Sequence, residues 1–358
     1  MKKKNNSERF EVCLQFIELD LTTECNLWCQ HCRTNANLTY RNLTFKTYTS
    51  LVDQIQVMGV NNIALSGGEP LLNNNLVKMI AYARGKGLEV HLITNSTLIT
   101  EKHARVFKNL HFLHPKGKLR IVTSLDGLEE THDNLRGCQG AFHLCLSGVK
   151  HCIDQGLEVD VITTLRPDNL NQIASLADMA ENLGCNLFKV RPIIPLGRAR
   201  SNPSLSINRE MYFMALSRLV RIKYKKKGSL GVESSDPLWL LADRKLLEGL
   251  ENSYEIENGS VIGGCSAGIY SLYISAEGWV FPCAYLPCKL GQIKDKPLAE
   301  IWADSPFLKS LRNRDYLQGR CGKCKYRFVC GGCRGRAFAI SGNLMGEDPL
   351  CKKVAEEI

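Results

Sequence analysis

Three cysteines stand close together near the start of the chain, in the stretch CNLWCQHC. Three residues separate Cys25 from Cys29, and two separate Cys29 from Cys32. A structural zinc ion takes four protein ligands, so this stretch would be part of a zinc site whose fourth ligand lies elsewhere. A cubane iron–sulfur cluster has four irons, so three thiolates would leave one iron open to a further ligand. The spacing by itself indicates a metal site of one of these two kinds.

A second group of cysteines lies late in the chain, where eight of the sixteen fall between residues 265 and 351. Two CxxC pairs stand there, and such pairs are typical of zinc ribbons as well as of iron–sulfur proteins. A disulfide framework is not expected, because a 358-residue chain with 44% hydrophobic residues can bury a core of its own. The five remaining cysteines are expected to be small buried hydrophobes or thiols without a role: Cys13, Cys138, Cys145, Cys152 and Cys185.

Alternating strand and helix patterns must position these cysteines, and they fill the chain up to residue 228. The apolar pattern predicts strands at 14–21, 62–65, 88–94, 119–127, 157–165 and 186–193. It predicts helices at 44–58, 75–86, 100–109, 140–156, 169–183 and 208–226. Six such units imply parallel strands joined by right-handed crossovers, in either an open doubly wound sheet or an incomplete barrel.

The segments that follow the six strands have an unusual composition. They read, in chain order, CNLWCQHC, SGGEP, TNS, SLDG, TTLRPDN and RPIIPLGR. In both candidate folds, ligands gather at the carboxyl ends of parallel strands. We therefore expect these six segments to form one active face. Gly67 and Gly68 would let a ligand approach the backbone there, although a tight turn needs the same residues.

Beyond residue 228 the strand–helix pattern stops, and glycine, proline and cysteine become frequent. We expect a first domain over residues 12–228 and a second over residues 229–358. Residues 261–290 predict a hairpin that turns at Glu277-Gly278 in SLYISAEGWVFPC. The short segments between the cysteines predict a region that needs metal to hold it together.

The motifs Cys25-x3-Cys29-x2-Cys32 and Ser66-Gly67-Gly68-Glu69-Pro70, among strand–helix units, resemble the radical S-adenosylmethionine (SAM) superfamily over about residues 12–200. The resemblance implies an α/β fold with a partial (β/α)6 barrel. It implies that the three cysteines hold a 4Fe–4S cluster, whose open iron binds the amino and carboxylate groups of SAM. Transfer of one electron to the sulfonium then yields a 5′-deoxyadenosyl radical, which takes a hydrogen atom from a substrate. The missing fourth ligand of CNLWCQHC would be the cosubstrate itself.

The same resemblance assigns roles to polar residues at the strand ends. The residues expected along the methionine end of SAM are Ser66, Gly67, Gly68 and Glu69. His31 is expected in the aromatic place beside the adenine. The candidates for binding the ribose are Asn95, Ser124 and Asp126, and those for pairing with the carboxylate are Arg136 and Arg191. Asp126-Gly127 is also a favourable turn in its own right.

The later cysteines resemble the SPASM extension of that superfamily, which holds two auxiliary iron–sulfur clusters. The match consists of seven cysteines in order, a glycine five residues before the second, and the tail CGGCRGRAFAISGNLMGEDPLC. By this pattern the ligands of the first auxiliary cluster are Cys265, Cys283 and Cys333. The ligands of the second are Cys321, Cys324, Cys330 and Cys351.

The chain departs from the SPASM pattern at two places. Some SPASM enzymes have an extra cysteine shortly after the first, whereas Ser271 stands six residues on here. The first auxiliary cluster is then expected either to keep an open iron or to be completed by Cys288. Sulfatase-maturing members place an aspartate base after the second cysteine, whereas this chain has Ala284 and then Tyr285. It is therefore not expected to mature sulfatases.

The resemblance leaves three hypotheses about the substrate. In the preferred one, the chain modifies a ribosomally made peptide, and the auxiliary clusters transfer electrons or bind substrate. About twelve residues precede the first strand, so leader recognition would need a separate protein. In the second, the chain tailors the side chains of haem, another tetrapyrrole or another small-molecule cofactor, because basic residues would suit tetrapyrrole propionates. In the remote third, it is a zinc-ribbon nucleic-acid binder, although it lacks the basic and aromatic stripe expected of one.

The formal net charge is +10, and the most concentrated basic stretch is RIKYKKK at residues 221–227. Lysines at a solvated helix end and a surface for an acidic partner both fit this stretch. No apolar run is long enough to span a membrane, and no signal peptide follows the basic N-terminus. We expect a cytoplasmic enzyme that takes electrons from a donor such as flavodoxin or ferredoxin and binds neither nucleic acid nor membrane.

Overall fold

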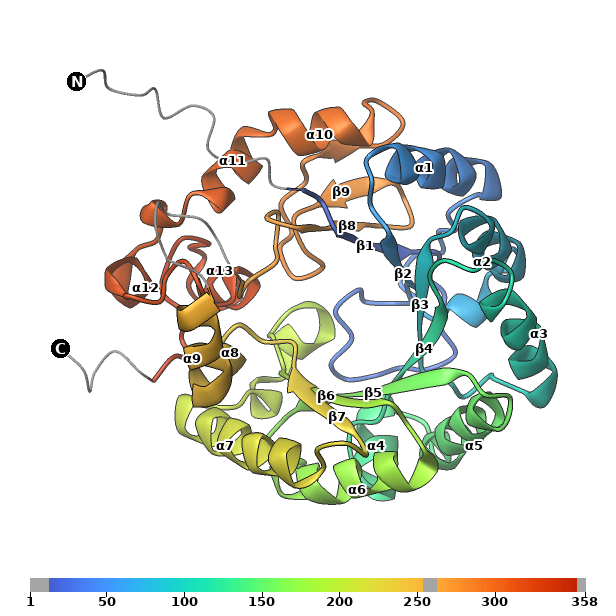
Figure 1. Cartoon of the computed structure of the whole chain (residues 1–358), viewed down its shortest axis with the longest axis horizontal. Coiled ribbons are helices and arrows are strands. Elements are labelled where there is room, and N and C mark those ends of the chain that lie inside the picture. Colours follow the sequence, from blue (N-terminus) through green and yellow to red (C-terminus); the bar gives the residue numbers. More distant parts are fainter. Residues whose placement is uncertain (1–12, 254–262, 353–358) are drawn as a thin grey trace.

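The computed structural model of the chain describes residues 13–253 and 263–352. Its strands form a ten-stranded sheet in the order β10-β9-β8-β1-β2-β3-β4-β5-β6-β7. The strands are β1 Phe16–Asp20, β2 Asn62–Ser66, β3 Glu89–Thr94, β4 Leu119–Ser124, β5 Glu158–Leu165, β6 Leu187–Pro192, β7 Gly231–Ser234, β8 Ser271–Ile274, β9 Trp279–Phe281 and β10 Gly291–Gln292. The sheet curves into an arc with helices along its outer side (Figure 1).

Strands β1 to β6 pair in parallel in chain order, as the sequence predicts. The helices that follow them are α1 Phe45–Val57, α2 Leu76–Gly85, α3 Glu101–His111, α4 Glu129–Arg136, α5 Ala141–Asp154, α6 Ile173–Leu183 and α7 Arg209–Lys225. Short 3₁₀ turns lie at η2 Pro70–Leu72, η3 Leu170–Gln172, η4 Gly197–Ser201, η5 Pro203–Leu205 and η6 Arg314–Tyr316. The sequential strand order favours the incomplete barrel over the doubly wound sheet, whose order reverses. The prediction of a partial (β/α)6 barrel is confirmed.

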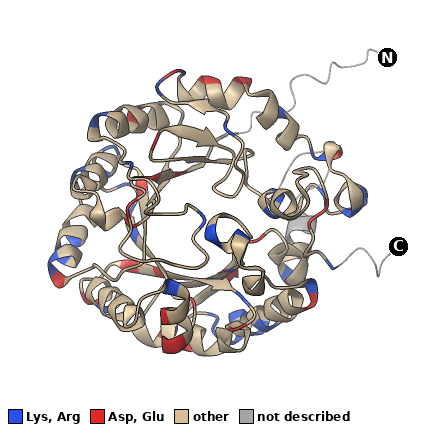
Figure 2. Ribbon diagram, turned by 180° about the vertical axis from the view of Figure 1, so that it is seen from behind, with Lys and Arg blue, Asp and Glu red and all other residues tan. Residues whose placement is uncertain are grey.

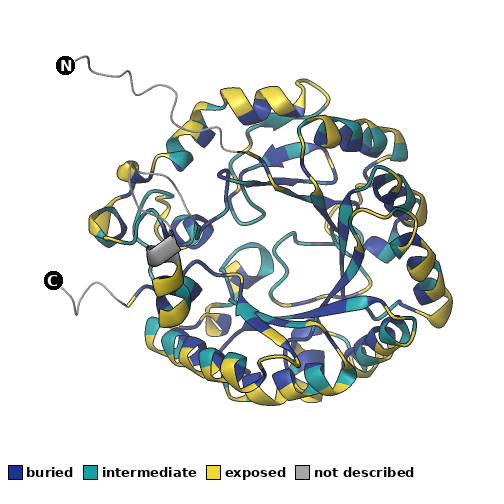
Figure 3. Ribbon diagram, in the orientation of Figure 1, coloured by how far each residue is buried: buried dark blue, intermediate teal, exposed yellow. Residues whose placement is uncertain are grey.

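Local sequence signals explain where several of these helices begin. Thr44 and Asn208 cap α1 and α7, each accepting a hydrogen bond from the backbone N–H three residues on. Thr100 forms a capping box with His103 at the start of α3. The strands behind these helices are buried along most of their length (Figure 3). This near-continuous burial of β2 and β5 is typical of parallel strands that are covered on both faces, whereas β3 and β6 alternate buried and half-buried residues.

Helix α4 was missed in the sequence, which predicted one helix over residues 140–156. Its stretch EETHDNLR holds a single aliphatic residue, Leu135, so it shows no apolar stripe. Glu129 and Glu130 favour a helix start there, and Gly137 ends the helix in the left-handed region. The buried side chains of α4 are mostly polar, and one of them, Arg136, belongs to the site described below.

Two additions extend the predicted sheet. Strand β7 lies beyond residue 228 and pairs in parallel with β6, so the sheet continues past the sixth unit. At the other edge, β8 pairs in parallel with β1, and β9 turns back to pair antiparallel with β8. The hairpin predicted at Glu277-Gly278 is therefore confirmed. The cysteine-rich part of the chain is joined to the barrel through β1, the strand that leads into CNLWCQHC.

The remaining helices run from the outer side beside α1 round to the open side of the arc (Figure 1). They are α8 Trp239–Ala242, α9 Arg244–Ser253, α10 Leu298–Asp304, α11 Pro306–Arg312, α12 Gly319–Lys323 and α13 Arg334–Ser341. Most of them are only one or two turns long. Short helices of this kind have little stability of their own, so packing or bound groups must hold them.

Charged residues of both signs are spread over the outer helices (Figure 2). The basic stretch at 221–227 forms the end of α7, where Lys223 pairs with Asp243. Lys226 pairs with Asp178 and Glu181. The structure therefore fits the helix-end interpretation of this stretch. Among the described helices, none has the length and apolar character needed to cross a membrane.

Candidate active site

A pocket opens at the carboxyl ends of strands β1 to β6, and the segments that follow these strands line it. Of the residues predicted from the sequence, those that line it are Cys25, Cys29, His31, Cys32, Ser66, Gly67, Gly68, Asn95, Ser124, Arg136 and Arg191. Glu69 and Asp126 lie behind its wall and are fully buried. The expectation of one active face is met, because the segments meet at a single pocket.

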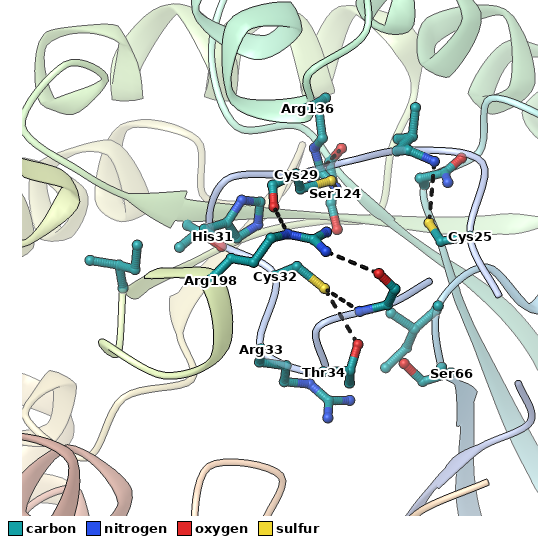
Figure 4. A pocket seen from close by; sticks show the side chains of 18 of the residues that line it. Cys25, Cys29, His31, Cys32, Arg33, Thr34, Ser66, Ser124, Arg136 and Arg198 are labelled. Carbon is teal, nitrogen blue, oxygen red and sulfur yellow. Dashed lines mark hydrogen bonds between the residues drawn. The ribbon is translucent and has the colours of Figure 1, made fainter. Parts of the chain in front are cut away.

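The three cysteines of CNLWCQHC line this pocket on a loop that we call the cysteine loop, residues 21–44 (Figure 4). Each sulfur has an N–H group nearby. The donors are the backbone of Leu27 to Cys25 (3.5 Å), the guanidinium of Arg136 to Cys29 (3.7 Å) and the backbone of Ala36 to Cys32 (3.5 Å). N–H groups directed at sulfur stabilise thiolates that bind metal. Burial raises the pKa of the Cys25 thiol to about 12, and a bound metal cation would favour its thiolate.

Arg198, which the sequence analysis did not single out, fastens the cysteine loop. Its backbone N–H donates to the carbonyl of Cys32 (2.9 Å), and its side chain donates to the carbonyls of Cys29 (2.7 Å) and Ala36 (3.0 Å). Figure 4 shows the side chain reaching across the loop between these two carbonyls. Gly197 must precede it, because a Cβ there would lie 2.2 Å from the Cys32 carbonyl oxygen. The only signal in the sequence was the position of RPIIPLGR after a strand.

Two asparagines hold the start of the cysteine loop. The Asn37 side chain accepts from the Cys25 N–H (2.7 Å) and donates to the Cys25 carbonyl (2.8 Å). Asn95, expected at the ribose, donates to the side chain of Asn26 (2.9 Å), next to the first cysteine. Asn95 therefore lines the pocket and also ties the end of β3 to the cysteine loop.

Only glycine fits at positions 67 and 68, because the backbone of the cysteine loop lies too close for a side chain there. A Cβ on Gly67 would lie 2.3 Å from the Thr22 carbonyl oxygen, and one on Gly68 would lie 2.1 Å from the Glu24 carbonyl oxygen. The N–H of Gly68 donates to Thr22 (2.7 Å), and that of Glu69 donates to Glu24 (2.7 Å). These two N–H groups, which the sequence suggested for a ligand, pair the SGGEP turn with the cysteine loop. The glycines thus bring the two motifs within backbone contact.

Replacing Gly68 by alanine should displace the cysteine loop and cost about 1–3 kcal/mol of stability, the usual range for overpacking. Less iron should then be retained per chain after anaerobic reconstitution. Gly85→Ala is the matched control, because a Cβ on that helical glycine meets nothing within 4 Å. Urea unfolding and iron analysis of both variants test this. Equal stability and iron content in the two variants would show that the close contact does not constrain the loop.

The Glu69 carboxylate makes its hydrogen bonds inside the protein, behind the pocket wall. It accepts from the Thr94 hydroxyl (2.7 Å), the Asn95 N–H (2.8 Å) and the Leu71 N–H (3.1 Å). Burial raises the pKa of this carboxyl group, although these hydrogen bonds oppose the shift. The side chain expected along SAM thus joins the ends of β2 and β3 behind the pocket.

Arg136, Asp126 and His31 form a buried polar cluster beside Cys29. Asp126 forms an ion pair with Arg136 and accepts from the Thr164 N–H (2.7 Å). Burial would raise the pKa of Asp126, but the Arg136 charge outweighs it and holds that pKa well below the usual range. Burial lowers the pKa of His31 to about 3, so its imidazole is neutral near pH 7.

Two buried nitrogens of this cluster, His31 Nδ1 and Arg136 Nε, have no hydrogen-bond partner among the described residues. Both residues line the pocket, and Figure 4 shows them near Cys29. Buried polar atoms are normally satisfied, so these two are available to a bound molecule. Three cysteines, a neutral aromatic ring and unpaired donors fit the cluster and SAM that the resemblance implies.

The pocket is also lined by four arginines: Arg33, Arg136, Arg191 and Arg198. Arg33, next to Cys32, forms ion pairs with Glu18 and Asp20 on β1 and lies over the Tyr273 ring (4.9 Å). Tyr273 donates to Asp20 (2.5 Å), so this group ties the cysteine loop to β1 and β8. Arg191 instead lies over the ring of Tyr285 (5.5 Å).

The C-terminal cysteines that the SPASM pattern names all lie in the described part of the chain. Four of them line one small cavity together with Arg320 and Asp348: Cys321, Cys324, Cys330 and Cys351. Cys265, expected in the other group, lies beside this cavity, because its backbone N–H donates to the carbonyl of Cys330 (3.1 Å). Burial raises the pKa of Cys283 and of Cys333, and the Cys265 charge adds to both shifts. The SPASM pattern assigns Cys333 to the first group although it lies in the sequence between Cys330 and Cys351 of the second, and the contact between Cys265 and Cys330 is compatible with that assignment.

The Ser271 hydroxyl, at the first departure from the SPASM pattern, donates to the Ser266 carbonyl (3.1 Å) and to the Ser266 hydroxyl (2.9 Å). The Ser271 side chain is therefore engaged within its own turn. Burial raises the pKa of Cys288, the other thiol considered for the first auxiliary cluster.

Arg336 connects the two C-terminal groups. It is fully buried and pairs with Asp236 (2.6 Å) and with both oxygens of Asp348 (2.5 and 2.8 Å). Asp348 accepts from the Cys333 N–H (2.7 Å), and its own N–H lies 3.3 Å from the sulfur of Cys321. One ion-pair network therefore contacts a cysteine of each group. In the described part of the chain, no three His, Cys, Asp or Glu side chains are arranged to hold a single metal ion.

Comparisons with known proteins agree with these features. A family model described as the radical SAM superfamily matches residues 19–180, and one for the SPASM iron–sulfur cluster-binding domain matches residues 265–325. An AdoMet-dependent heme synthase from Methanosarcina barkeri is 32% identical, over 94% of this chain and 96% of that protein. A PqqA peptide cyclase from Bradyrhizobium diazoefficiens is 25% identical, over 98% of this chain and 89% of that protein.

The fold recurs in solved structures. SuiB of Streptococcus suis bound to S-adenosylmethionine aligns with a TM-score of 0.76 at 17% identity, over 95% of this chain and 78% of SuiB. At this identity the likeness concerns the fold alone. It extends through the barrel and the cysteine-rich C-terminal part together.

Proposed function

Since this chain belongs to the radical SAM superfamily and carries a SPASM domain, we propose that it uses SAM to remove a hydrogen atom from the side chain of a tetrapyrrole. Cys25, Cys29 and Cys32 would hold the 4Fe–4S cluster that the family implies, and this cluster with SAM supplies the 5′-deoxyadenosyl radical. Arg198, Asn37 and the glycines of SGGEP hold the cysteine loop in place. His31 offers an uncharged ring and a free nitrogen in the pocket.

The similarity to heme synthases over nearly the full length of both chains supports a tetrapyrrole substrate. Arg191, which lines the pocket and lies over a tyrosine ring, supports it independently, because tetrapyrroles of the haem pathway carry propionate carboxylates. Haem has vinyl groups where some precursors still have propionates. The proposed reaction is therefore the conversion of a propionate side chain into a vinyl group.

The atoms and electrons of this conversion balance. The radical removes a hydrogen atom from the propionate carbon next to the ring, giving 5′-deoxyadenosine and a substrate radical. The C–C bond to the carboxylate then breaks, CO2 leaves, and the vinyl double bond forms. One electron remains, so a one-electron acceptor of the iron–sulfur class is required. We propose the two C-terminal cysteine groups, beginning near residue 265, as the sites of such auxiliary clusters, and a flavodoxin or ferredoxin as the donor for SAM cleavage.

A peptide substrate is the second candidate. It was the preferred hypothesis from the sequence, and the similarity to a PqqA peptide cyclase supports it. SuiB has also been solved with its precursor peptide SuiA. The heme synthases match at higher identity, so the tetrapyrrole takes first place here.

The direct test is substrate-dependent SAM cleavage by the reconstituted, reduced enzyme. Iron coproporphyrin III should increase 5′-deoxyadenosine formation, and its mass should fall by CO2 and two hydrogen atoms for each propionate converted. Protohaem, which already carries the vinyl groups, should not be converted. If no propionate-bearing tetrapyrrole is converted while a precursor peptide is, the peptide hypothesis replaces this one.

A further inference from the structure

The arginines of the pocket differ in what they contact. Arg33 is paired with Glu18 and Asp20, and Arg136 is paired with Asp126. Arg198 donates to two carbonyls of the cysteine loop and lies over the Trp28 ring (4.3 Å). Within residues 13–253 and 263–352, the Arg191 side chain makes neither a hydrogen bond nor an ion pair, although it lines the same pocket. Its guanidinium is therefore the arginine group left available for an anionic ligand.

The Arg191 guanidinium lies over the ring of Tyr285, and the C-terminal part of the chain holds that tyrosine in place. Its guanidinium carbon lies 5.5 Å from the centre of the Tyr285 ring. The Tyr285 backbone N–H donates to the sulfur of Cys283 (3.3 Å), a proposed auxiliary ligand. Gly335 in α13 makes room for this tyrosine, since a Cβ there would lie 2.7 Å from the Tyr285 Cβ. The Tyr285 hydroxyl makes no hydrogen bond to any described residue, and Tyr285 also lines the pocket.

SAM and the proposed substrate both carry carboxylates, so each carboxylate has to be assigned to its own arginine. SAM binds the cluster through its amino acid end, and the arginine at the cysteines is Arg136, which reaches Cys29 and keeps Nε unpaired. Arg136 also contacts the Ser124 carbonyl at the end of β4 (3.4 Å), whereas Arg191 is the last residue but one of β6. Two strand spacings, about 10 Å, separate these strand ends. Arg191 thus stands on the side of the pocket toward Cys283.

We propose that Arg191 and Tyr285 form the subsite for a substrate carboxylate, and that Arg136 serves the carboxylate of SAM. The guanidinium of Arg191 pairs with a propionate, and the Tyr285 hydroxyl donates a second hydrogen bond to it. A substrate held there lies between the SAM site and the first auxiliary group, where the leftover electron must go. This inference rests on the proposed function and adds the residues that select and orient the substrate.

The test measures binding as well as turnover in the reconstituted holoenzyme. Titration with iron coproporphyrin III, followed by its absorbance, gives the dissociation constant. Arg191→Gln should raise it about 10–100-fold, as expected for the loss of a charge-assisted hydrogen bond. Arg191→Lys should recover part of the affinity, because it keeps the charge without the planar fork. Arg200→Gln, at a nearby exposed arginine, is the matched control for the lost charge and should bind normally.

A second ligand separates the carboxylate contact from a general loss of structure. The methyl ester of the same tetrapyrrole should bind wild type more weakly than the free acid. In Arg191→Gln, the preference for the acid over the ester should shrink to about 3–10-fold, the part that the Tyr285 hydroxyl supplies, because the charged group that distinguishes them is gone. Tyr285→Phe should weaken the acid by about 3–10-fold and the ester less, as for one neutral hydrogen bond.

Different results distinguish a failure of this subsite from a failure of the proposed function. If Arg191→Gln raises the KM for SAM or stops SAM cleavage without substrate, Arg191 serves SAM and the inference is wrong. Tetrapyrrole binding that equals wild type in Arg191→Gln also overturns it, while leaving the proposed function standing. If wild type neither binds nor converts any tetrapyrrole carboxylate, the proposed function fails and this subsite fails with it.

Discussion

Cys29→Ala should reduce 5′-deoxyadenosine formation to the level seen without protein. Cys29 is the most buried of the three loop cysteines, and Arg136 donates to its sulfur. Without it, two thiolates remain in the loop, too few to hold a cubane whose fourth iron is reserved for SAM. The C-terminal iron should be retained, since those cysteines are held by separate segments. Product formation by chromatography and iron counting on the same sample measure both effects.

Cys138→Ala is the matched control for this variant. Cys138 packs against the small hydrophobic cluster of Leu27, Cys29 and Ala141, so its loss removes a thiol from the same neighbourhood. It has no expected role as a ligand and should keep SAM cleavage. Equal loss of activity in both variants would mean that packing rather than cluster binding explains the effect. Wild-type activity in Cys29→Ala would refute the assignment of CNLWCQHC.

Arg336→Met should be the most destabilising substitution in the C-terminal part. It leaves Asp236 and Asp348 buried without their partner, and breaking a buried ion pair in this way costs about 3–5 kcal/mol. Native domains have only about 5–15 kcal/mol of stability, so much of it would be lost. Because Asp348 contacts Cys333 and Cys321, iron bound by both C-terminal groups should fall as well.

Urea unfolding of the reconstituted protein and its iron content test this prediction. Arg320→Met is the control, because the Arg320–Glu347 pair is partly exposed and should contribute at most about 1 kcal/mol. Adding Asp348→Asn and Asp236→Asn to Arg336→Met should recover part of the loss, since the buried charges are then removed. If Arg336→Met is no less stable than Arg320→Met, the network does not hold the C-terminal groups together.

The parts of the site that were predicted correctly share a cause. Each of the six strands ends in an unusual segment, and parallel strands bring their carboxyl ends to one edge. The sequence could therefore indicate that Cys29, Gly68 and Arg191 would meet, although they are far apart along the chain. The spacing of the cysteines and the family resemblance then specified the chemistry.

The parts that were missed depend on contacts that no local pattern encodes. Arg198 serves the site through carbonyls of a loop more than 150 residues away, and an arginine gives no signal of that. Glu69 and Asp126 occupy the expected motifs but turn their carboxylates into the protein, where Thr94, Asn95 and Arg136 satisfy them. Helix α4 was missed because its buried face is polar.

The choice of substrate depended on information outside the motifs. The SPASM pattern is compatible with peptides and with tetrapyrroles, and the peptide was preferred from the sequence. The similarity to heme synthases and the available Arg191 favour a carboxylate-bearing tetrapyrrole. A positive charge of +10 could not make this distinction, because it suits both kinds of acidic substrate.

The most direct measurement uses iron coproporphyrin III deuterated in its propionate side chains. The reduced, reconstituted enzyme should convert it with SAM, and mass spectrometry should find deuterium in the 5′-deoxyadenosine. That result would place the hydrogen abstraction on the propionate and the radical in the pocket of CNLWCQHC. Unlabelled 5′-deoxyadenosine would contradict the proposed substrate position, and a reduced enzyme that forms none at all would contradict the radical SAM chemistry itself.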